Sequence, residues 1–269
     1  MNYLRNVAII QHITTRISRN KNALMVITGG TGSGKSYAAL RLGEKIAAEM
    51  GHKFKVDNVI FDIPKFMEQK KTAKPGTVFI FDEFGVTMGA RDWQSGKNKV
   101  MSYVLQTFRF ENYICIFTVP RLNFIDKHAR ELMHYWVETQ SIDYKKELAK
   151  LKVYLLNVDP FSNDMYRKFV QIYDKENATV KGCPYLKLKM PSKGLITAYE
   201  KKKTEFLNSN KAGEWSDILR GKKDDKPKPK KWAAKCDKCN YEYEALVPNP
   251  KKCPSCSARK RLVVAPAPI

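Results

Sequence analysis

A glycine-rich segment near the N-terminus carries the residues whose types and spacing most directly indicate chemistry. It reads Gly29, four residues, then Gly34, Lys35 and Ser36, the pattern of a phosphate-binding loop. Glycines let backbone N–H groups surround an anion without Cβ clashes, whereas Lys reaches the phosphates and the Ser hydroxyl binds Mg²⁺. A merely flexible glycine loop is the alternative. The pattern predicts that ATP and Mg²⁺ are bound by Gly29, Gly30, Thr31, Gly32, Ser33, Gly34, Lys35, Ser36 and Tyr37.

Two acids, Asp82 and Glu83, directly follow the apolar run of residues 77–81. A carboxylate at the end of a strand beside the phosphate loop holds the water shell of Mg²⁺, which is the role we expect for Asp82 together with Ser36. The next acid faces the γ-phosphate and can deprotonate the attacking water, so Glu83 is the candidate general base. A surface turn is the alternative for both. The pair predicts a nucleotide hydrolase.

Two further side chains are candidates for the same reaction. Thr118 lies near the end of the largely apolar run of residues 113–119, where a polar side chain would lie beside the γ-phosphate, although capping of a strand end is an alternative role. Arg109 lies just before this run and could reach a neighbouring subunit's site to offset charge in the transition state. Solvent exposure or contact with nucleic acid is the alternative for Arg109.

Four of the six cysteines form two CxxC pairs, separated by thirteen residues. Each pair can place two sulfurs on one ion, and the stretch between them can form a hairpin, which predicts a structural tetrahedral zinc ribbon. Iron is a less favoured alternative, and no thioredoxin-like pattern supports a redox role. Basic and aromatic residues around the pairs suit nucleic acid, with a protein partner as the rival. The predicted zinc ligands are Cys236, Cys239, Cys253 and Cys256.

The elements that must position these residues alternate between apolar strands and helices. Strands are expected at residues 23–28, 54–62, 77–81 and 113–119, with helices at 37–50, 64–71, 98–110 and 126–135. This alternation predicts an α/β fold whose mostly parallel sheet has helices on both faces. Residues 144–174 contain strand-like stretches, which indicate an antiparallel extension, and residues 192–207 read as a helix with Ser192 as N-cap.

Composition shifts divide the chain into five predicted parts. The stretch 221–231 is charged, bears prolines and lacks large apolar residues, so it is typical of a linker. The predicted parts are an amphipathic helix in residues 1–22, an ATPase domain in 23–207, a charged linker in 208–231, a zinc ribbon in 232–264 and a disordered tail in 265–269.

The chain is strongly basic, with 49 Lys and Arg against 27 Asp and Glu and a formal net charge of +22 over 269 residues. Nucleic acid is the most economical partner, because neutralising phosphates releases counterions. Solubility, adaptation to high temperature and an anionic membrane surface are alternatives. No apolar run is long enough to cross a bilayer and no signal peptide is evident, while Cys115 and Cys183 demand no disulfide. These features favour a reducing, cytoplasmic location.

The order of motifs resembles that of a known family. GGTGSGKS, FIFDEFG, ARDW, LQTFRFENYICIFTVP and NFIDKHARELMHYW are similar to the FtsK–HerA superfamily of pumping ATPases, especially the zonular occludens toxin-like proteins of phages and mobile elements. The likeness covers residues 23–205, and it implies a RecA-like core, hexameric rings and ATP hydrolysis coupled to movement of nucleic acid. Two features depart from the family. Pro120 stands where a sensor Gln is usual, with Gln106 as a possible substitute, and a cysteine module replaces the membrane-spanning segment.

These features favour an ATP-driven motor that translocates or packages nucleic acid, with DNA as the favoured cargo, for a virus, plasmid or other mobile element. Two alternatives remain. One is a nucleotide-gated DNA-binding adaptor or regulator, and the other is a virion-assembly ATPase that acts with a membrane partner.

Overall fold

In the computed structural model, the described residues are 2–61, 63–82, 111–125, 127–162, 164–174, 179–219, 232–236, 238–245, 252–257 and 263–266. Contacts divide the chain into two compact units, Met1–Asn208 and Ser209–Ile269. The elements that begin in the first unit are α1 (Asn2–Ser18), β1 (Ala23–Thr28), α2 (Lys35–Glu49), η1 (Val56–Asn58), β2 (Val59–Ile60), α3 (Ile63–Gln69), β3 (Val78–Phe81), β4 (Ile114–Val119), η3 (Leu122–Phe124), α6 (Lys127–Glu131), β5 (Tyr135–Asp143), β6 (Leu148–Val158), β7 (Met165–Phe169), β8 (Gln171–Asp174), β9 (Thr179–Gly182), β10 (Tyr185–Lys189) and α7 (Lys193–Leu219).

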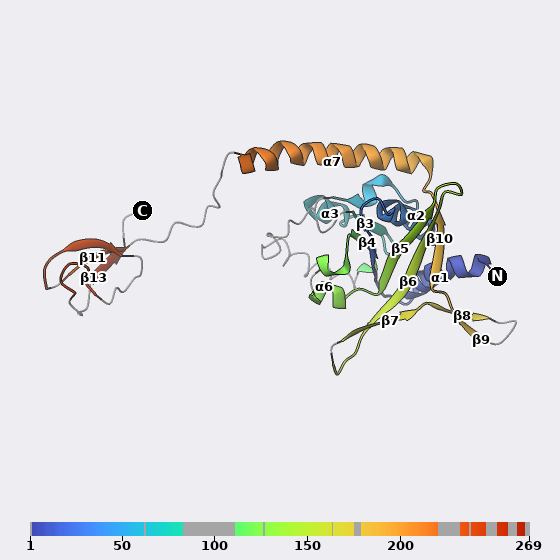
Figure 1. The fold of residues 1–269 in the computed structure, drawn as a ribbon, viewed down its shortest axis with the longest axis horizontal. Coiled ribbons are helices and arrows are strands. Elements are labelled where there is room, and N and C mark those ends of the chain that lie inside the picture. Colours follow the sequence, from blue (N-terminus) through green and yellow to red (C-terminus); the bar gives the residue numbers. More distant parts are fainter. Residues whose placement is uncertain are drawn as a thin grey trace. The chain divides into compact units, whose positions relative to one another are not determined.

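A mixed sheet forms the centre of the first unit (Figure 1). Its order within the described residues is β10-β6-β5-β1-β4-β3-β2, with β7 also pairing with β6, and β8 and β9 form a separate hairpin. Strands β1 to β5 pair in parallel, whereas β6, β7 and β10 pair antiparallel. The predicted α/β class and the antiparallel extension are thus confirmed.

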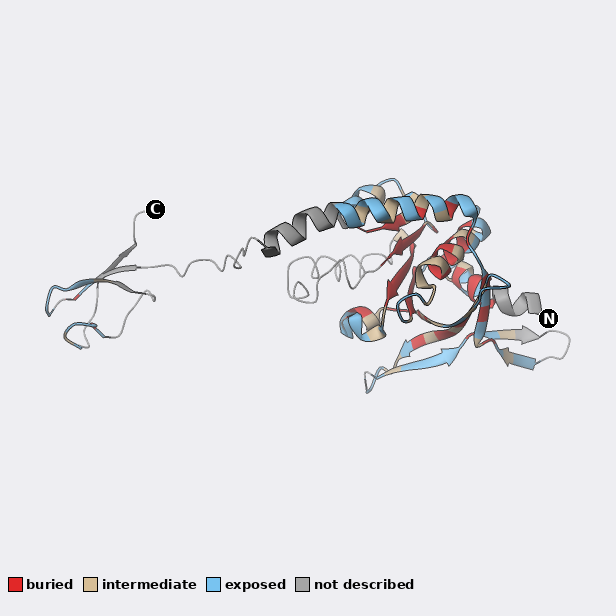
Figure 2. Ribbon diagram, turned by 45° about the horizontal axis from the view of Figure 1, so that its top comes forward, coloured by how far each residue is buried: buried red, intermediate tan, exposed pale blue. Residues whose placement is uncertain are grey.

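Strands β1, β3 and β4 are buried along their whole length, as expected for parallel strands covered on both faces (Figure 2). One face packs against α1, α2 and the start of α7, through a cluster that includes Ile13, Leu40 and Tyr199. The opposite face packs around Phe66, Phe79 and neighbouring apolar side chains. The N-terminal amphipathic helix therefore packs on the core, with Ile13 fully buried.

Four sequence-based boundaries were wrong. The helix expected to reach Tyr135 is the short α6, and β5 begins at Tyr135, where Tyr135 and Val137 are buried beside β1. The strand expected over residues 54–62 pairs only at Val59–Ile60, because β2 is an edge strand whose approach is the 3₁₀ turn η1.

The other two corrections concern the C-terminal part. Residues 208–219, which were assigned to the linker, continue helix α7. The predicted disordered tail begins too early, since Ala265 and Pro266 pair with β11 as part of β13.

The second unit contains a small antiparallel sheet in the order β12-β11-β13. Its strands are β11 (Trp232–Lys235), β12 (Glu242–Ala245) and β13 (Val263–Pro266). Among the described residues of both units, no helix is long and apolar enough to cross a membrane.

Candidate functional site

The phosphate-binding loop joins β1 to α2 and takes the shape that its glycines permit. Gly34 is the N-cap of α2 at a φ of 81°, a left-handed conformation that disfavours a side chain. A Cβ on Gly29 would lie 1.9 Å from Thr139 Oγ1 of β5, so the loop passes too close to the sheet for any larger residue. Lys35 Nζ donates to Gly30 O at 2.7 Å, which brings its ammonium group back over the loop. The helix that begins here directs its N–H groups and positive dipole end toward the space above the loop.

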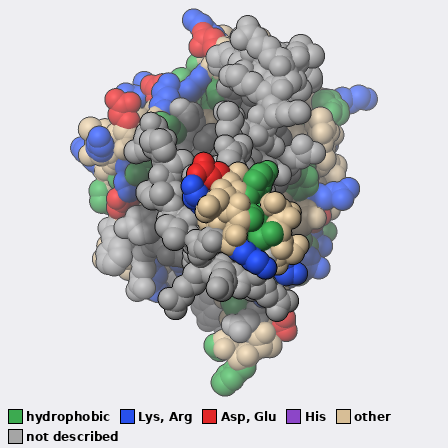
Figure 3. Space-filling model, turned by 90° about the vertical axis from the view of Figure 1, so that its left-hand side faces the viewer, with side chains coloured by type: hydrophobic (Ala, Val, Ile, Leu, Met, Phe, Trp, Pro, Cys, Tyr) green, Lys and Arg blue, Asp and Glu red, His purple; other side chains and the backbone are tan. Residues whose placement is uncertain are grey.

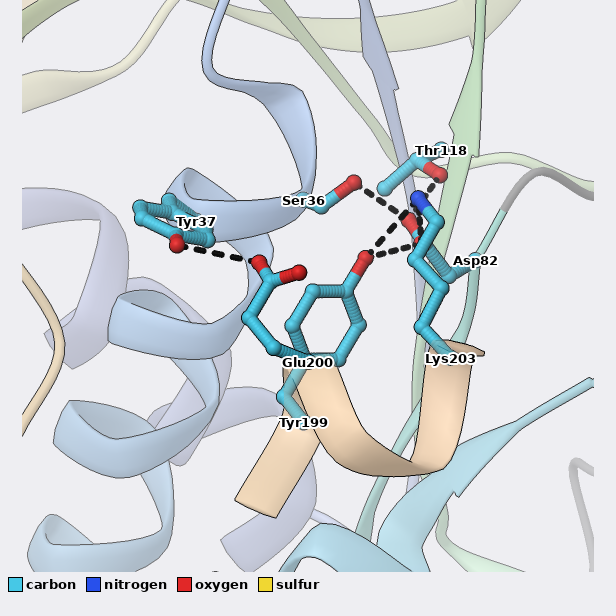
Figure 4. A network of polar contacts seen from close by, with 7 residues as sticks. All are labelled: Ser36, Tyr37, Asp82, Thr118, Tyr199, Glu200 and Lys203. Atoms are coloured by element: carbon cyan, nitrogen blue, oxygen red, sulfur yellow. Dashed lines mark hydrogen bonds and ion pairs between the residues drawn. The ribbon is translucent and has the colours of Figure 1, made fainter. Parts of the chain in front are cut away.

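Asp82 is the centre of a polar network at the carboxyl ends of β1, β3 and β4 (Figure 4). Its carboxylate is 1% exposed and accepts hydrogen bonds at Oδ1 from Ser36 Oγ (2.8 Å) and Thr118 Oγ1 (2.7 Å). Because β4 lies between β1 and β3, Thr118 lies between the strand before the loop and the strand before Asp82. The structure therefore brings together Ser36, Asp82 and Thr118, as the sequence predicted for a shared site.

Two side chains that sequence reasoning missed complete this network from α7. Tyr199 OH donates to Asp82 Oδ2 at 2.5 Å, and Lys203 Nζ lies 3.3 Å from the same oxygen and 3.1 Å from Tyr199 OH. Tyr199 is 1% exposed, and burial together with nearby Asp82 raises the pKa of its hydroxyl well above the usual range. Tyr199 therefore stays protonated and acts as a donor. Its four-residue spacing from Lys203 on one helix face was the signal available in the sequence.

The oxygen atoms at this position suit Mg²⁺. A buried carboxylate beside a Ser hydroxyl offers the hard oxygen ligands that this ion prefers, and Asp82 has a cation, Lys203, already within ion-pair distance. The residues that would hold Mg²⁺ are thus Ser36 and Asp82. When bound there with a nucleotide, the ion would neutralise phosphate charge.

A cavity of about 730 Å³ opens above the loop. Lys35, Ser36 and Thr118 line its polar end, while Ile142 and Met190 contribute apolar surface. Tyr37, which was predicted to bind nucleotide, also lines the cavity, and its hydroxyl donates to Glu200 of α7 at 3.0 Å. The cavity therefore combines an anion-binding end with an apolar wall, as a nucleotide requires.

Two predicted catalytic residues and one candidate sensor are not among the described residues. Glu83 and Arg109 lie outside the described residues, as does Gln106, the candidate sensor. The backbone carbonyl of Pro120 accepts the Gly29 N–H at 3.3 Å, and this hydrogen bond ties the phosphate-binding loop to the end of β4. Pro120, which stands where the resembled family usually has a sensor Gln, thus makes a backbone contact with the phosphate-binding loop.

The cysteine pairs come together in the second unit. The Sγ atoms of Cys236, Cys239, Cys253 and Cys256 all lie within 4.8 Å of one another, with two Sγ–Sγ distances of 3.7 Å. Four sulfurs arranged tetrahedrally about 2.3 Å from a zinc ion would be separated by about 3.8 Å, so the arrangement fits this ion. Backbone N–H groups of Cys239 and Lys238 lower the pKa of Cys236 to about 7, whereas burial and the neighbouring thiols raise the pKa of Cys239 to about 11, so the first thiolate of the cluster forms at Cys236. The cluster is compatible with the predicted zinc ribbon.

The described histidines near the core have structural partners. His134 Nδ1 accepts the Leu24 N–H at 3.0 Å, and burial lowers the pKa of His134 to about 3, so the ring is neutral. His12 Nδ1 lies 2.8 Å from Tyr135 OH. Both rings therefore have hydrogen-bonding partners within the first unit.

Comparison with known proteins gives similarity to solved structures only. No known protein family matches the chain, and no curated protein matches it. Among solved structures, the chain is similar to the N-terminal domain of zonular occludens toxin from Neisseria meningitidis, with 19% identity and a TM-score of 0.35. The match covers 58% of this chain and 96% of that one. A score this low does not by itself establish a shared function, which must be judged from the site.

Proposed function

We propose that this chain is an ATP-hydrolysing motor that moves nucleic acid, with DNA as its cargo. The observation that carries the proposal is the buried Asp82 carboxylate joined to Ser36 at the first turn of α2, directly beside the phosphate-binding loop. A buried carboxylate needs compensating partners, and a loop of backbone N–H groups attracts anions. Together they form a site for a phosphate–metal pair.

The chain's own residues have distinct roles in this proposal. Lys35 and the loop N–H groups bind the β- and γ-phosphates, while Ser36 and Asp82 hold Mg²⁺. Glu83 follows Asp82 in the sequence, and we assign it to orient water and accept its proton. Thr118 holds Asp82 through its hydroxyl.

Tyr199 is a positioning residue in this account, because it acts on the nucleotide site through Asp82. Its hydrogen bond fixes one carboxylate oxygen, while Ser36 and Thr118 fix the other. Arg109 is assigned to a neighbouring subunit's site in a ring, which the family resemblance implies to be a hexamer.

The cargo assignment is supported by charge. The net charge of +22 is large for 269 residues, and Figure 3 shows Lys and Arg side chains among the described residues on its visible side. Dispersed positive charge suits a polyanion that contacts many sites at once. The zinc module is assigned to recruit DNA or a protein partner.

A nucleotide-gated adaptor is the second candidate, and the contacts of α7 favour it specifically. Lys203 and Tyr199 link Asp82 to a helix that continues to Leu219, so occupancy of the nucleotide site could change the position of α7. In that case slow hydrolysis would reset a switch and would not drive movement.

Steady-state ATP hydrolysis and displacement of streptavidin from DNA separate the two candidates. A motor should show DNA-stimulated ATP hydrolysis and should displace streptavidin from the end of biotinylated DNA, with both activities lost in Glu83→Gln. DNA binding that responds to nucleotide, with no stimulation and no displacement, would replace the motor with the adaptor. The two activities report on hydrolysis and movement separately.

A further inference from the structure

The antiparallel part of the sheet has one face that the nucleotide site does not use. On β6, Leu151 and Val153 are buried in the core, whereas Lys150 and Lys152 lie on the other face. We name this outer surface of β5, β6, β7 and β10 the cation–aromatic face. It is carried by seven side chains: Trp136, Lys150, Lys152, Tyr154, Arg167, Phe169 and Tyr185.

Aromatic rings form a row across three strands of this face. Trp136 of β5 stacks on Tyr154 of β6 with centroids 5.0 Å apart, and Tyr154 stacks on Phe169 of β7 at 5.4 Å. The rings are nearly parallel, with interplanar angles of 29° and 22°. Phe169 at the end of the row is 41% exposed, so an aromatic surface remains open to a ligand.

Cations lie against these rings. The Arg167 guanidinium is 4.9 Å from the centroid of Tyr154 and 5.4 Å from that of Trp136. Lys152 Nζ is 5.4 Å from Tyr154, and Lys150 Nζ is 4.2 Å from the ring of Tyr185 on β10. Contacts of this kind are attractive by about 0.5–1 kcal/mol at exposed sites, and they hold the charged groups beside the apolar surface.

The pairing of strands places like charges together. Lys150 of β6 is directly opposite Lys187 of β10, an arrangement that destabilises an antiparallel pair. On the other side of β6, Glu138 is opposite Lys152. Lys150, Lys152 and Lys187 therefore gather on neighbouring positions of this face, with the carboxylate of Glu138 beside Lys152.

We propose that the cation–aromatic face binds single-stranded nucleic acid. Lys150, Lys152 and Arg167 contact the phosphate backbone, and the exposed rings of Phe169 and Tyr185, which is 42% exposed, stack on bases. Single strands are favoured over duplex because only unpaired bases offer free faces for stacking, and such stacking tolerates any sequence. The assignment of this face as the cargo site rests on the proposed function, whereas binding itself requires no hydrolysis.

Fluorescence anisotropy without nucleotide tests the charges. The probe is a labelled oligo(dT) about 20 nucleotides long, with oligo(U) of equal length as the RNA arm. Lys150→Gln/Lys152→Gln should weaken binding about tenfold and reduce the slope of log affinity against log salt by about 1.4, because each single-strand phosphate contact contributes about 0.7. The matched control Lys45→Gln/Lys53→Gln, at two exposed lysines outside this face, should stay within about twofold of wild type.

A second pair of variants tests the rings. Phe169→Leu/Tyr185→Leu keeps apolar bulk, and it should weaken binding about tenfold while leaving the salt slope unchanged. The control Phe124→Leu removes a ring that is 44% exposed outside this face, and it should have little effect. Thermal melts by circular dichroism confirm that each compared variant is folded.

Three results would overturn the inference: equal loss in the lysine variant and its control, no loss in the ring variant, or equally tight binding of duplex DNA or phosphatidylserine vesicles. Basal ATP hydrolysis is measured on the same samples. A chain that binds oligo(dT) through this face but never hydrolyses ATP would sink the proposed function and leave this inference standing. ATP hydrolysis together with oligo(dT) binding that is unchanged in the variants of this face would overturn this inference and leave the proposed function standing.

Discussion

Tyr199 and Asp82 give the sharpest expectation at the residue scale. Tyr199→Phe removes the donor to Asp82 Oδ2 and keeps the ring in the core. Loss of a hydrogen bond to a charged group should lower the free energy of unfolding by about 1.5–3 kcal/mol. We also expect the Mg²⁺ concentration for half-maximal ATP hydrolysis to rise about threefold to tenfold. This corresponds to a loss of about 0.6–1.4 kcal/mol of Mg²⁺-binding free energy, because the Asp82 carboxylate would no longer be held in one orientation.

The Mg²⁺ titration distinguishes positioning from packing. A lower melting temperature with an unchanged Mg²⁺ requirement would show that Tyr199 only stabilises the fold. Tyr113→Phe is the matched control, because Tyr113 is also buried and donates to a backbone carbonyl, Lys70 O, away from the loop.

His134 predicts an acid-sensitive fold. The folded pKa of about 3 lies below the ordinary value of 6.5, so the unfolded chain binds more protons between these values. Stability from this group is present above pH 6.5 and is lost as pH falls toward 3, at up to about 1.4 kcal/mol per pH unit. His134→Gln, which keeps an acceptor for the Leu24 N–H, should flatten the loss in a urea-unfolding series from about pH 7 to 4. An unchanged slope in this variant would rule out His134 as the cause.

The sequence predicted some site residues and missed others for a physical reason. Lys35, Ser36 and Asp82 stand in local patterns that report their chemistry directly. Tyr199 contacts Asp82 across 117 residues, and its role exists only after α7 has packed on the sheet. A Tyr followed four residues later by Lys is too common on helices to identify a site.

At the scale of elements, helix α7 supplies two side chains, Tyr199 and Lys203, that contact Asp82. Lys203 is a cation within 3.3 Å of Asp82, so it should compete with Mg²⁺ for the same carboxylate. Lys203→Met should therefore lower the Mg²⁺ requirement for hydrolysis, opposite to the effect of Tyr199→Phe. Lys201→Met, an exposed neighbour on the same helix, serves as control. An increased Mg²⁺ requirement in Lys203→Met would contradict the competition.

The strands that are buried on both faces were predicted from the sequence. The strand β5, which is defined by its pairing with β1, was not. The apolar runs of β1, β3 and β4 match the predicted strands within one residue. Strand β5 was missed because Glu138, Thr139 and Gln140 interrupt its apolar pattern, although parallel pairing with β1 fixes it as a strand. Its place beside the phosphate-binding loop follows from topology, which local sequence does not encode.

At the scale of the whole molecule, the two units should respond differently to metal removal. The second unit has a small sheet and four clustered thiols, so zinc would supply much of its folding free energy. A strong chelator should unfold it and release about one zinc ion per chain, while the melting transition of the first unit is unchanged. Colorimetric zinc release and circular dichroism follow the two events. Retention of the module's signal after complete chelation would contradict a structural zinc site.

We propose that Asp82, which accepts a hydrogen bond from Ser36 at the phosphate-binding loop, forms a Mg²⁺-dependent hydrolysis site. The most direct measurement is steady-state ATP hydrolysis by wild type, Asp82→Asn and the exposed-carboxylate control Asp164→Asn, across a Mg²⁺ titration. We expect Mg²⁺-dependent turnover in wild type and in Asp164→Asn, with a loss of about 100-fold or more in Asp82→Asn. Equal turnover in all three proteins, or turnover independent of Mg²⁺, would contradict this proposal.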